Sequence, residues 1–491
     1  MNREIFHQII IGIVCNLLIV DCGLSEGWPT PTMTKFSDGN DPVKLSSSEE
    51  ALVINLMYVG VGMGALSPIF LMDKIGRKWT LLAAALPKII SWIVIGLAKN
   101  SHALYAGRIT AGIGCGIAYS VLPMYIGEVS TKRTRGPLGT LLSVLINIGL
   151  LMIYTIGLYV NRFQMAMMAL VIPVLFFMTF IWLPESSVYL TRKKNYKSAE
   201  KSLKWSLGKD NVDIELDEIK KIVSTQEKDD DNYNNNNNNK GFIKSFINAM
   251  KIPGNRRSFR IMFILCGTLG LTGAAPILSY QSNIFKQSGF GLGSDFSIII
   301  TGCTIVIAGT TCVSIVKIIG KRKLLLIAAP IAVLSLAIVA TFFTLLEHGV
   351  NVHNFNWIPI VFVVIYVFVV GLAFNPIPLA YLGEIFSFEV KVPAGICSSL
   401  YYAVSTTVTV KMYQILADNY GTFFPFWIFT GITFILWILI YLYVPETEGK
   451  SLAEIQIMLN DISINNEKSS MKFKSIKKII PLPTTVYPTI N

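Results

Sequence analysis

Long apolar segments separated by short polar links dominate the chain. A membrane-spanning helix needs roughly 20 mostly apolar residues, and by that measure the sequence predicts twelve spans. They lie near residues 6–26, 51–71, 79–98, 103–127, 138–159, 164–183, 259–285, 293–319, 323–346, 357–384, 392–416 and 422–444. The N-terminal segment has a charge before an apolar run, as a signal peptide has. It has no convincing small-residue cleavage site, so we interpret it as the first span.

The segment between the sixth and seventh spans is polar and differs from the other links. Residues 195–221 combine helical apolar spacing with many charges, which predicts short helices beside a membrane domain. Residues 229–239 form a polar low-complexity run, so we expect a disordered insert there, and the tail after about residue 465 is expected to be disordered too. The predicted domains are a six-span half over 1–183, a linker over 184–258, a second six-span half over 259–446 and a tail over 447–491.

Composition supports a membrane protein and excludes several other classes. Apolar residues make up 52% of the chain and charged residues 15%, too few to cover a soluble surface. The net charge of +12 comes from short basic clusters between spans, which argues against nucleic-acid binding. These clusters lie on the same side as both termini, so the positive-inside rule predicts that this side is cytoplasmic. We expect the membrane to be the plasma membrane.

The seven cysteines all lie in apolar stretches without metal-ligand spacing. We therefore expect no metal, no cofactor and no disulfide framework. The chain also contains no nucleophile–base set and no metal-ligand cluster, so we do not expect an enzyme.

The two halves carry the same charged motifs in the same order. The first half contains Asp73-Lys74-Ile75-Gly76-Arg77-Lys78, Tyr125-Ile126-Gly127-Glu128 and Pro184-Glu185-Ser186. The second contains Gly320-Lys321-Arg322-Lys323, Tyr381-Leu382-Gly383-Glu384 and Pro445-Glu446-Thr447. A cation follows the middle motif's glutamate by seven residues in both halves, as Arg135 and Lys391. Such duplication predicts a transporter built from repeats, with its substrate site between the halves.

These motifs, together with Gly107-Arg108 at the fourth span and Asn375-Pro376-Ile377-Pro378 in the tenth, resemble the sugar porter branch of the major facilitator superfamily. The resemblance covers nearly the whole chain, and Gly27-Trp28-Pro29-Thr30-Pro31 is most similar to the insect trehalose- and hexose-transporter group. It implies an all-α membrane protein of two pseudo-symmetric six-helix halves. It also implies a small-molecule solute, a sugar of the trehalose or hexose type, carried through the lipid bilayer by alternating access. The sequence does not define an oligomeric state.

The resemblance assigns the charged motifs to an inner gate, in which arginines and glutamates pair when the gate is closed. The residues concerned are Asp73, Arg77, Lys78, Glu128, Arg135, Glu185, Arg322, Glu384, Lys391 and Glu446. Ion pairs that exist in only one state bias the equilibrium between states. The alternative is that these charges only set topology. Lys391 stands where the family has arginine, and lysine cannot bind a carboxylate with two prongs, so we expect a weaker gate in the second half.

Most of the family's sugar-binding amides are absent. Their positions, and that of the family's tryptophan, fall on Ser143, Leu269, Gly270, Ala275, Ile305 and Leu379. Each neutral hydrogen bond that the site cannot make to a sugar lowers the binding free energy by roughly 1 kcal/mol. Other polar residues at membrane depth are candidate substrate contacts, with helix–helix packing as the alternative for each. These candidates are Asn147, Ser143, Thr272, Tyr280, Gln281, Asn283, Asn375 and Tyr402.

Proton coupling in this family implies an acid in span one within reach of an arginine in span four. Here the candidates are Asp21, Glu26 and Arg108, and neither acid falls squarely on the family position. Glu26 also fits a solvated residue at the outer mouth of the carrier. In that case no acid is placed to couple transport to protons, and we therefore expect facilitated diffusion. Two further hypotheses remain: a transporter-like sensor that no longer transports, and a carrier of a less polar solute.

Overall fold

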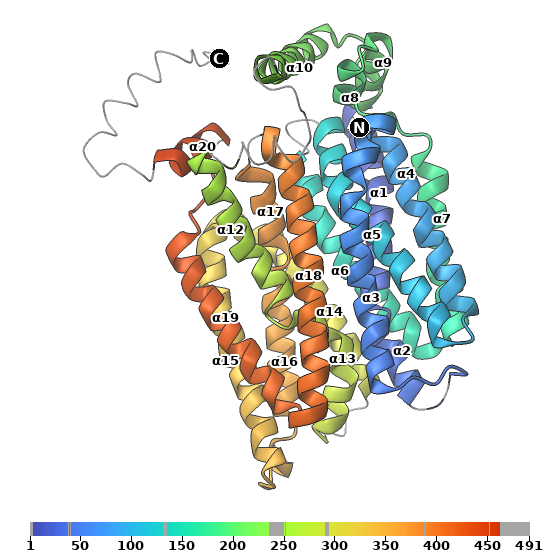
Figure 1. Cartoon of the computed structure of the whole chain (residues 1–491), viewed down its shortest axis with the longest axis vertical. Helices are drawn as coiled ribbons and strands as arrows, with labels where there is room; N and C mark the ends of the chain where they lie inside the picture. Colours follow the sequence, from blue (N-terminus) through green and yellow to red (C-terminus); the bar gives the residue numbers. More distant parts are fainter. Residues whose placement is uncertain are drawn as a thin grey trace, which may run out of the picture.

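The computed structural model describes residues 3–37, 39, 41–130, 135–234, 250, 252–289, 294–386, 388–450 and 452–461. All regular elements in these ranges are helices. The first bundle contains α1 (Arg3–Gly27), α2 (Pro29–Ser37), α3 (Ser47–Leu66), α4 (Pro68–Leu97), α5 (Ser101–Val129), α6 (Arg135–Tyr159) and α7 (Arg162–Phe180). The second contains α12 (Pro253–Gly270), α13 (Ala274–Gln287), α14 (Ser294–Ile319), α15 (Lys321–Glu347), η1 (His353–Phe355), α16 (Ile358–Val369), η2 (Val370–Phe374), α17 (Pro376–Glu384), α18 (Phe388–Tyr420) and α19 (Phe423–Tyr443). The two bundles stand side by side (Figure 1).

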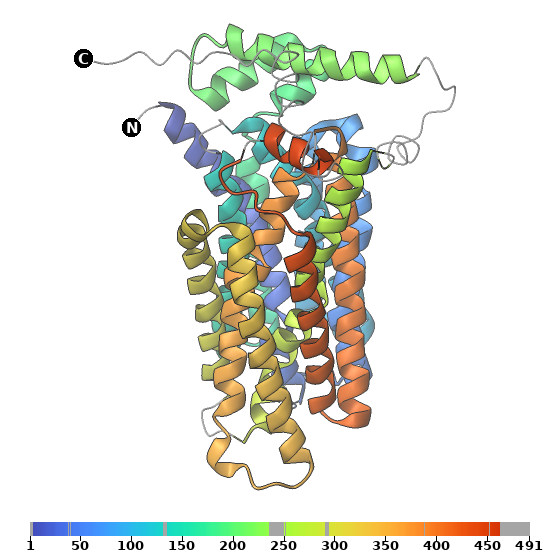
Figure 2. The same cartoon turned by 90° about the vertical axis from the view of Figure 1, so that its left-hand side faces the viewer.

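Three helices lie across one end of the paired bundles. They are α8 (Ser187–Arg192), α9 (Tyr196–Leu207) and α10 (Asp213–Asn234), and α20 (Leu452–Asp461) lies near the same end (Figure 2). We call this end the linker end and the opposite one, which carries α2, the distal end. The short linker helices expected from the sequence are present.

Helix α10 extends into the segment expected to be disordered. It continues to Asn234 and so includes residues 229–234. The reason is physical: once a helix has nucleated, adding one residue costs little compared with starting it. The remainder of the asparagine run and the tail after residue 465 lie outside the described residues.

Eleven segments among the described residues are long and apolar enough to cross a membrane. The eleventh predicted span, 392–416, is not among these segments; it lies within α18, which runs the full height of its bundle beside the others (Figure 1). Serines and threonines make α18 less apolar, and some of them bond to neighbouring helices. Thr409, for example, donates a hydrogen bond to the carbonyl of Gly270 on α12 at 2.8 Å.

Two predicted spans are broken helices. The span predicted at 259–285 consists of α12 and α13, which meet at Gly273 with a φ of +86°. The span predicted at 357–384 consists of α16, the π-helical η2 and α17. The break comes at Asn375-Pro376, because proline has no N–H to continue the ladder of helical hydrogen bonds. Irregular backbone at membrane depth is tolerated where protein covers it or a cavity adjoins it.

Small residues allow the helices of the first bundle to cross closely. A Cβ built on Gly112 would lie 2.0 Å from the carbonyl oxygen of Met57, and one built on Gly116 would lie 2.1 Å from that of Val61. Both contacts are between α5 and α3. Gly112 and Gly116 of the fourth span therefore allow α5 to pack closely against α3.

The two bundles meet mainly along three pairs of helices, α3 with α18, α6 with α14, and α2 with α13, with smaller contacts of α5 with α18 and of α6 with α17. At the distal end Thr30 donates to the carbonyl of Leu278 at 2.8 Å, and Ser47 donates to the Asp418 carboxylate at 2.9 Å. Deeper in the interface, the Asn147 amide donates to the carbonyl of Ile305 at 3.2 Å.

Candidate functional site

A buried turn at the linker end of the first bundle is organised by one carboxylate. Glu185 accepts hydrogen bonds from the backbone N–H of Arg77 at 3.1 Å, Lys78 at 3.0 Å and Ser186 at 2.8 Å. The turn passes through Gly76 with a φ of +89°, a conformation that disfavours any side chain. Burial raises the pKa of Glu185, and the hydrogen bonds from Lys78 and Ser186 lower it, with a net upward shift.

The second bundle repeats this turn. Glu446 accepts from the backbone N–H of Lys321 at 3.1 Å and of Arg322 at 3.0 Å, after Gly320, which also has a φ of +89°. The tyrosines of the two middle motifs occupy matching places as well. Tyr125 donates to the carbonyl of Pro184 at 2.7 Å, and Tyr381 donates to that of Pro445 at 2.7 Å. The motifs that recur in the sequence therefore form the same turn and the same hydrogen bonds in both bundles.

Ion pairs join the same motifs within each bundle. Arg77 lies 3.1 Å from Glu128, and Lys321 lies 2.9 Å from Glu384 and also contacts Glu448. The partner of Glu384 is thus Lys321, which sequence reasoning left out of the gate in favour of Arg322. Arg322 instead donates to the carbonyl of Tyr441 at 2.8 Å, as Lys78 does to that of Ile181. If Gly320 is aligned with Gly76, Lys321 falls on the position of Arg77, so this alignment would have identified Lys321 as the partner of Glu384.

Three of the predicted gate residues have described backbone only. The side chains of Asp73, Arg135 and Lys391 are outside the described residues. The pairs that are described connect elements of one bundle, so each holds together the helix ends of its own half.

The predicted substrate residues are distributed over several environments. Asn147 is 1% exposed and its amide bonds α6 to α14, so it has a structural contact. Thr272 is buried and bonded to Tyr366 at 3.2 Å. Gln281 is buried and accepts from Thr301 at 2.7 Å. Tyr280 is buried and stacked on Tyr413, with 5.2 Å between ring centroids.

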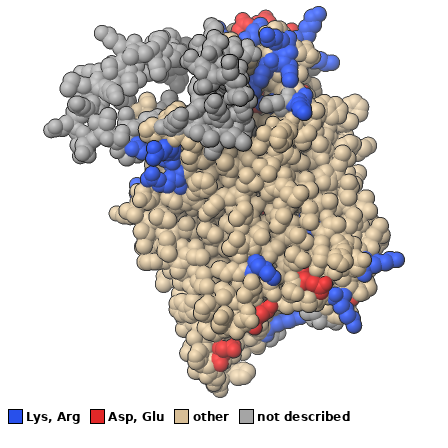
Figure 3. Space-filling view, in the orientation of Figure 1, with Lys and Arg blue, Asp and Glu red and all other residues tan. Residues whose placement is uncertain are grey.

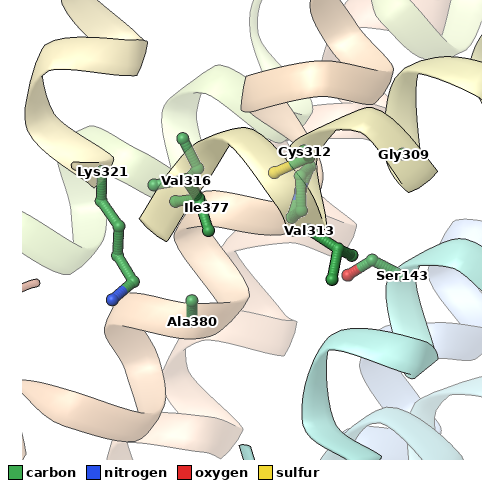
Figure 4. Close-up of a pocket in the computed structure, with 9 residues that line it drawn as sticks. Ser143, Gly309, Cys312, Val313, Val316, Lys321, Ile377 and Ala380 are labelled. Atoms are coloured by element: carbon green, nitrogen blue, oxygen red, sulfur yellow. The ribbon is translucent and has the colours of Figure 1, made fainter. Parts of the chain in front are cut away.

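The other predicted residues lie closer to open space. Asn283, Asn375 and Tyr402 are half-buried. Ser143 lines a cavity of about 40 Å³ between the bundles (Figure 4). The other lining residues are Gly309, Cys312, Val313, Val316, Lys321, Pro376, Ile377 and Ala380. Most of these lining side chains are apolar.

A charged network crosses the middle of the first bundle. Lys88 on α4 pairs with Asp21 on α1 at 2.9 Å, and both side chains are fully buried. Trp92 donates its indole N–H to Asp21 at 2.7 Å. Sequence reasoning missed Lys88; its signal was a lone lysine inside the apolar segment 79–98. Asp21 is thus paired with Lys88 rather than with the arginine of span four.

Arg108 and Glu26 extend this network towards the second bundle. The Arg108 guanidinium donates to the carbonyl of Ser25 at 2.7 Å and lies 5.1 Å from the centre of the Trp28 ring. Glu26 is half-buried and accepts from the Tyr119 hydroxyl at 2.8 Å. Glu26 is therefore held in a polar contact at mid-depth rather than solvated at the outer mouth, and Tyr119 is a further residue that sequence reasoning missed.

Two six-span bundles with duplicated charged turns and a polar network at their interface define a carrier of the major facilitator fold. Over residues 14–459 the chain matches the family described as "Sugar (and other) transporter", and it belongs to that family. This assignment makes the protein a membrane carrier of the sugar-transporter class, not an enzyme.

The chain is similar to two insect proteins over nearly its whole length. It is 29% identical over 451 residues to the facilitated trehalose transporter Tret1 of Apis mellifera ligustica, covering 91% of this chain and 87% of that one. It is 28% identical over 458 residues to Tret1 of Bombyx mori, covering 93% of this chain and 87% of that one.

Solved structures share the fold. The major facilitator proton:xylose symporter XylE bound to 6-bromo-6-deoxy-D-glucose superposes with a TM-score of 0.71 at 19% identity, covering 91% of this chain and 99% of that one. A partially occluded inward-open conformation of XylE from E. coli also has a TM-score of 0.71, at 17% identity, with the same coverage of both chains.

Proposed function

We propose that this protein carries trehalose or a hexose across the plasma membrane by facilitated diffusion. The observation that carries the proposal is the duplicated turn, in which Glu185 and Glu446 fasten matching helix ends in the two bundles. Each bundle is thereby held together internally, as rigid-body rocking of two halves about a central site requires. The similarity to facilitated trehalose transporters supports the type of cargo.

The moving parts in this proposal are residues 1–183 and 259–446, joined by the linker 184–258 and followed by a tail over 447–491. We place the linker end in the cytoplasm. Lys and Arg gather around that end beside some acidic residues, and the distal end also carries both signs of charge (Figure 3). Lys193, Lys194 and Lys197 are exposed there, and cytoplasmic loops are the ones enriched in lysine and arginine.

The residues of the charged turns act in this proposal as the inner gate. Described contacts link Arg77 to Glu128 and Lys321 to Glu384. Asp73, Arg135 and Lys391 are assigned to the same gate from their motifs. Removing one of these pairs loosens the helix ends of one half and so slows the exchange between the two open states.

A second candidate function is transport of a less polar solute. It is favoured by Leu379, which is 43% exposed where the family has a tryptophan, and by the apolar lining of the cavity beside Ser143.

Uptake of labelled trehalose, glucose and fructose into oocytes tests the proposal. We expect saturable uptake by the protein at the cell surface, and loss of it in an Arg77→Ala/Glu128→Ala variant whose surface level is confirmed by biotinylation. The matched control is Lys204→Ala/Glu200→Ala, which removes an exposed ion pair on α9 and is expected to leave uptake unchanged. Surface expression of the wild type without saturable uptake of any of the three sugars would contradict the proposal and favour a sensor or another solute.

A further inference from the structure

One charged side chain of the mid-depth network is not completely buried. Asp21 and Lys88 are 0% exposed and Arg108 is 1% exposed, whereas Glu26 is only half-buried. Asp21 and Lys88 neutralise each other in a direct ion pair. Glu26 is thus the one carboxylate in this described network that a solute between the bundles can touch.

The two buried cations hold the backbone next to Glu26. Lys88 donates to the hydroxyl of Ser25 at 2.7 Å, and Arg108 donates to the carbonyl of the same residue at 2.7 Å. Arg108 is itself fixed by a second bond, from its Nε to the carbonyl of Val53 at 3.2 Å. Because Ser25 precedes Glu26, these contacts give the Glu26 side chain a defined starting point. A site held by rigid supporting contacts binds its ligand at lower entropic cost.

Hydroxyl groups from both bundles face the Glu26 carboxylate. Tyr119 of the first bundle donates to it at 2.8 Å, and Tyr402 of the second lies within hydrogen-bonding reach of it. The Tyr402 ring packs edge-on against Tyr58, with 6.0 Å between centroids and 85° between planes. An ionised carboxylate has about four acceptor positions. Two tyrosine hydroxyls therefore leave it able to accept from a ligand as well.

We propose that Glu26 binds the hydroxyl groups of the transported solute and that Tyr402 completes the contact from the other bundle. This inference rests on the proposed transport function and names the part of the interface that recognises the cargo. Sugar hydroxyls donate well to a carboxylate, and aromatic rings suit the apolar faces of a sugar. The apolar side chains of Ile305 and Leu379 cannot hydrogen-bond a sugar, and the polar groups of α1, α5 and α18 take over that role.

The same network selects a neutral solute. Asp21 and Lys88 form a neutral ion pair, and an ionised Glu26 carboxylate would balance the charge of Arg108. A charged solute would add an unbalanced charge at membrane depth, which is costly. The class of ligand is accordingly a neutral polyol or sugar.

Uptake kinetics of Glu26→Gln, Glu26→Asp and Tyr402→Phe test this assignment. A charge-assisted hydrogen bond corresponds to roughly tenfold or more in affinity and a neutral one to roughly fivefold. We expect Glu26→Gln to raise KM for the transported sugar about tenfold or more and Tyr402→Phe to raise it about threefold to fivefold, with smaller changes in maximal rate per surface molecule. Glu26→Asp, which keeps the charge, should fall between Glu26→Gln and the wild type.

Tyr401→Phe is the matched control. Tyr401 neighbours Tyr402 on α18 but its ring packs on Phe263, with 5.2 Å between centroids. We expect its KM to equal that of the wild type. Melting temperatures of the purified variants separate a folding defect from the loss of a bond to the sugar.

The alternatives give different results. Unchanged KM values in all three Glu26 and Tyr402 variants would overturn the assignment and leave the proposed function standing. If Glu26 were a coupling acid, Glu26→Gln would abolish acid-driven accumulation without changing KM, which also overturns it. If the wild type transports none of the sugars, sugar binding to purified wild type and Glu26→Gln decides the matter: equal binding, or none, overturns the assignment.

Discussion

At the scale of single residues, the buried pair of Lys88 and Asp21 is the costliest feature of the first bundle. Both side chains are fully buried and 2.9 Å apart. Taking two charges out of water costs several kcal/mol for each, and only good geometry and further hydrogen bonds offset this. Trp92 and Ser25 supply those bonds. The space for the lysine stem comes from Gly114, where a Cβ would lie 2.4 Å from Cγ of Lys88.

Breaking this pair from one side should destabilise the protein strongly. We expect Lys88→Met to cost about 3–5 kcal/mol, because it leaves the Asp21 carboxylate buried without its counter-charge. The double variant Lys88→Met/Asp21→Asn should recover much of the loss, since no charge is then left uncompensated. Thermal unfolding of purified protein measures both. Lys204→Met on exposed α9 is the control and should leave the melting temperature unchanged. A double variant that is no more stable than Lys88→Met would contradict this account.

Sequence reasoning identified most charged residues but not all of their partners. Glu185 and Glu446 could be identified because they recur in matched motifs. Tyr119 could not, since a single tyrosine in an apolar run has no pattern to distinguish it, and Lys88 was missed although a lone lysine within an apolar span is itself a signal. Asn147 was singled out because amides are rare at membrane depth, yet its bond to Ile305 is a helix–helix contact. Which face of a helix a polar residue occupies depends on tertiary packing.

At the scale of elements, the contact between α3 and α5 depends on residues without side chains. Gly112 and Gly116 of α5 lie against backbone atoms of α3, and Gly64 of α3 lies against Ile113 of α5. Such close approach is typical of membrane helices, whose association relies on packing rather than on hydrophobic exclusion from water.

A single methyl group at this crossing should separate the two helices. We expect Gly112→Ala to destabilise the protein by about 1–3 kcal/mol, because its Cβ would overlap the carbonyl oxygen of Met57. The matched control is Gly127→Ala in the same helix, where no other atom lies within 4 Å of the new Cβ. Detergent-solubilised protein would be compared by thermal unfolding. If both variants melted alike, the glycines would serve flexure rather than packing.

The elements themselves were largely predictable, and their interruptions were not. Apolar length defines a span such as 259–285, but the break between α12 and α13 comes from the positive φ of Gly273 beside the Phe429 ring. Apolar length also predicted the span at 392–416, which lies within α18, a helix that is not among the eleven described segments apolar enough to cross a membrane. Helix breaks are tertiary features, because each requires neighbouring groups to satisfy the freed backbone.

At the scale of the whole molecule, the bundles contact each other through a few bonds at the distal end. Ser47 on α3 donates to Asp418 on α18, and Thr30 on α2 donates to Leu278 on α13. The sequence predicted two halves and a site between them. It did not predict which helix faces meet, since apolar residues suit both a face that packs on another helix and one that faces lipid.

Linking the distal ends covalently should stop transport. We expect Ser47→Cys/Asp418→Cys, joined by a short bifunctional thiol reagent with a reducible centre, to lose sugar uptake and to regain it with a reductant. The two hydrogen-bonded atoms are 2.9 Å apart, so the new thiols lie within reach of such a reagent. The single variants treated in the same way are the controls. Uptake that survives complete cross-linking would show that the distal ends need not separate.

The balance of charge at mid-depth has a consequence for the energetics of the cell. A carrier that moves one elementary charge through the membrane field works against about 2.3 kcal/mol for every 100 mV. With Glu26 ionised, Asp21, Lys88, Arg108 and Glu26 carry no net charge between them, and a sugar adds none. In the facilitated-diffusion mechanism proposed above, this network would carry no net charge through the field, and exchange of the sugar would follow its concentration gradient alone.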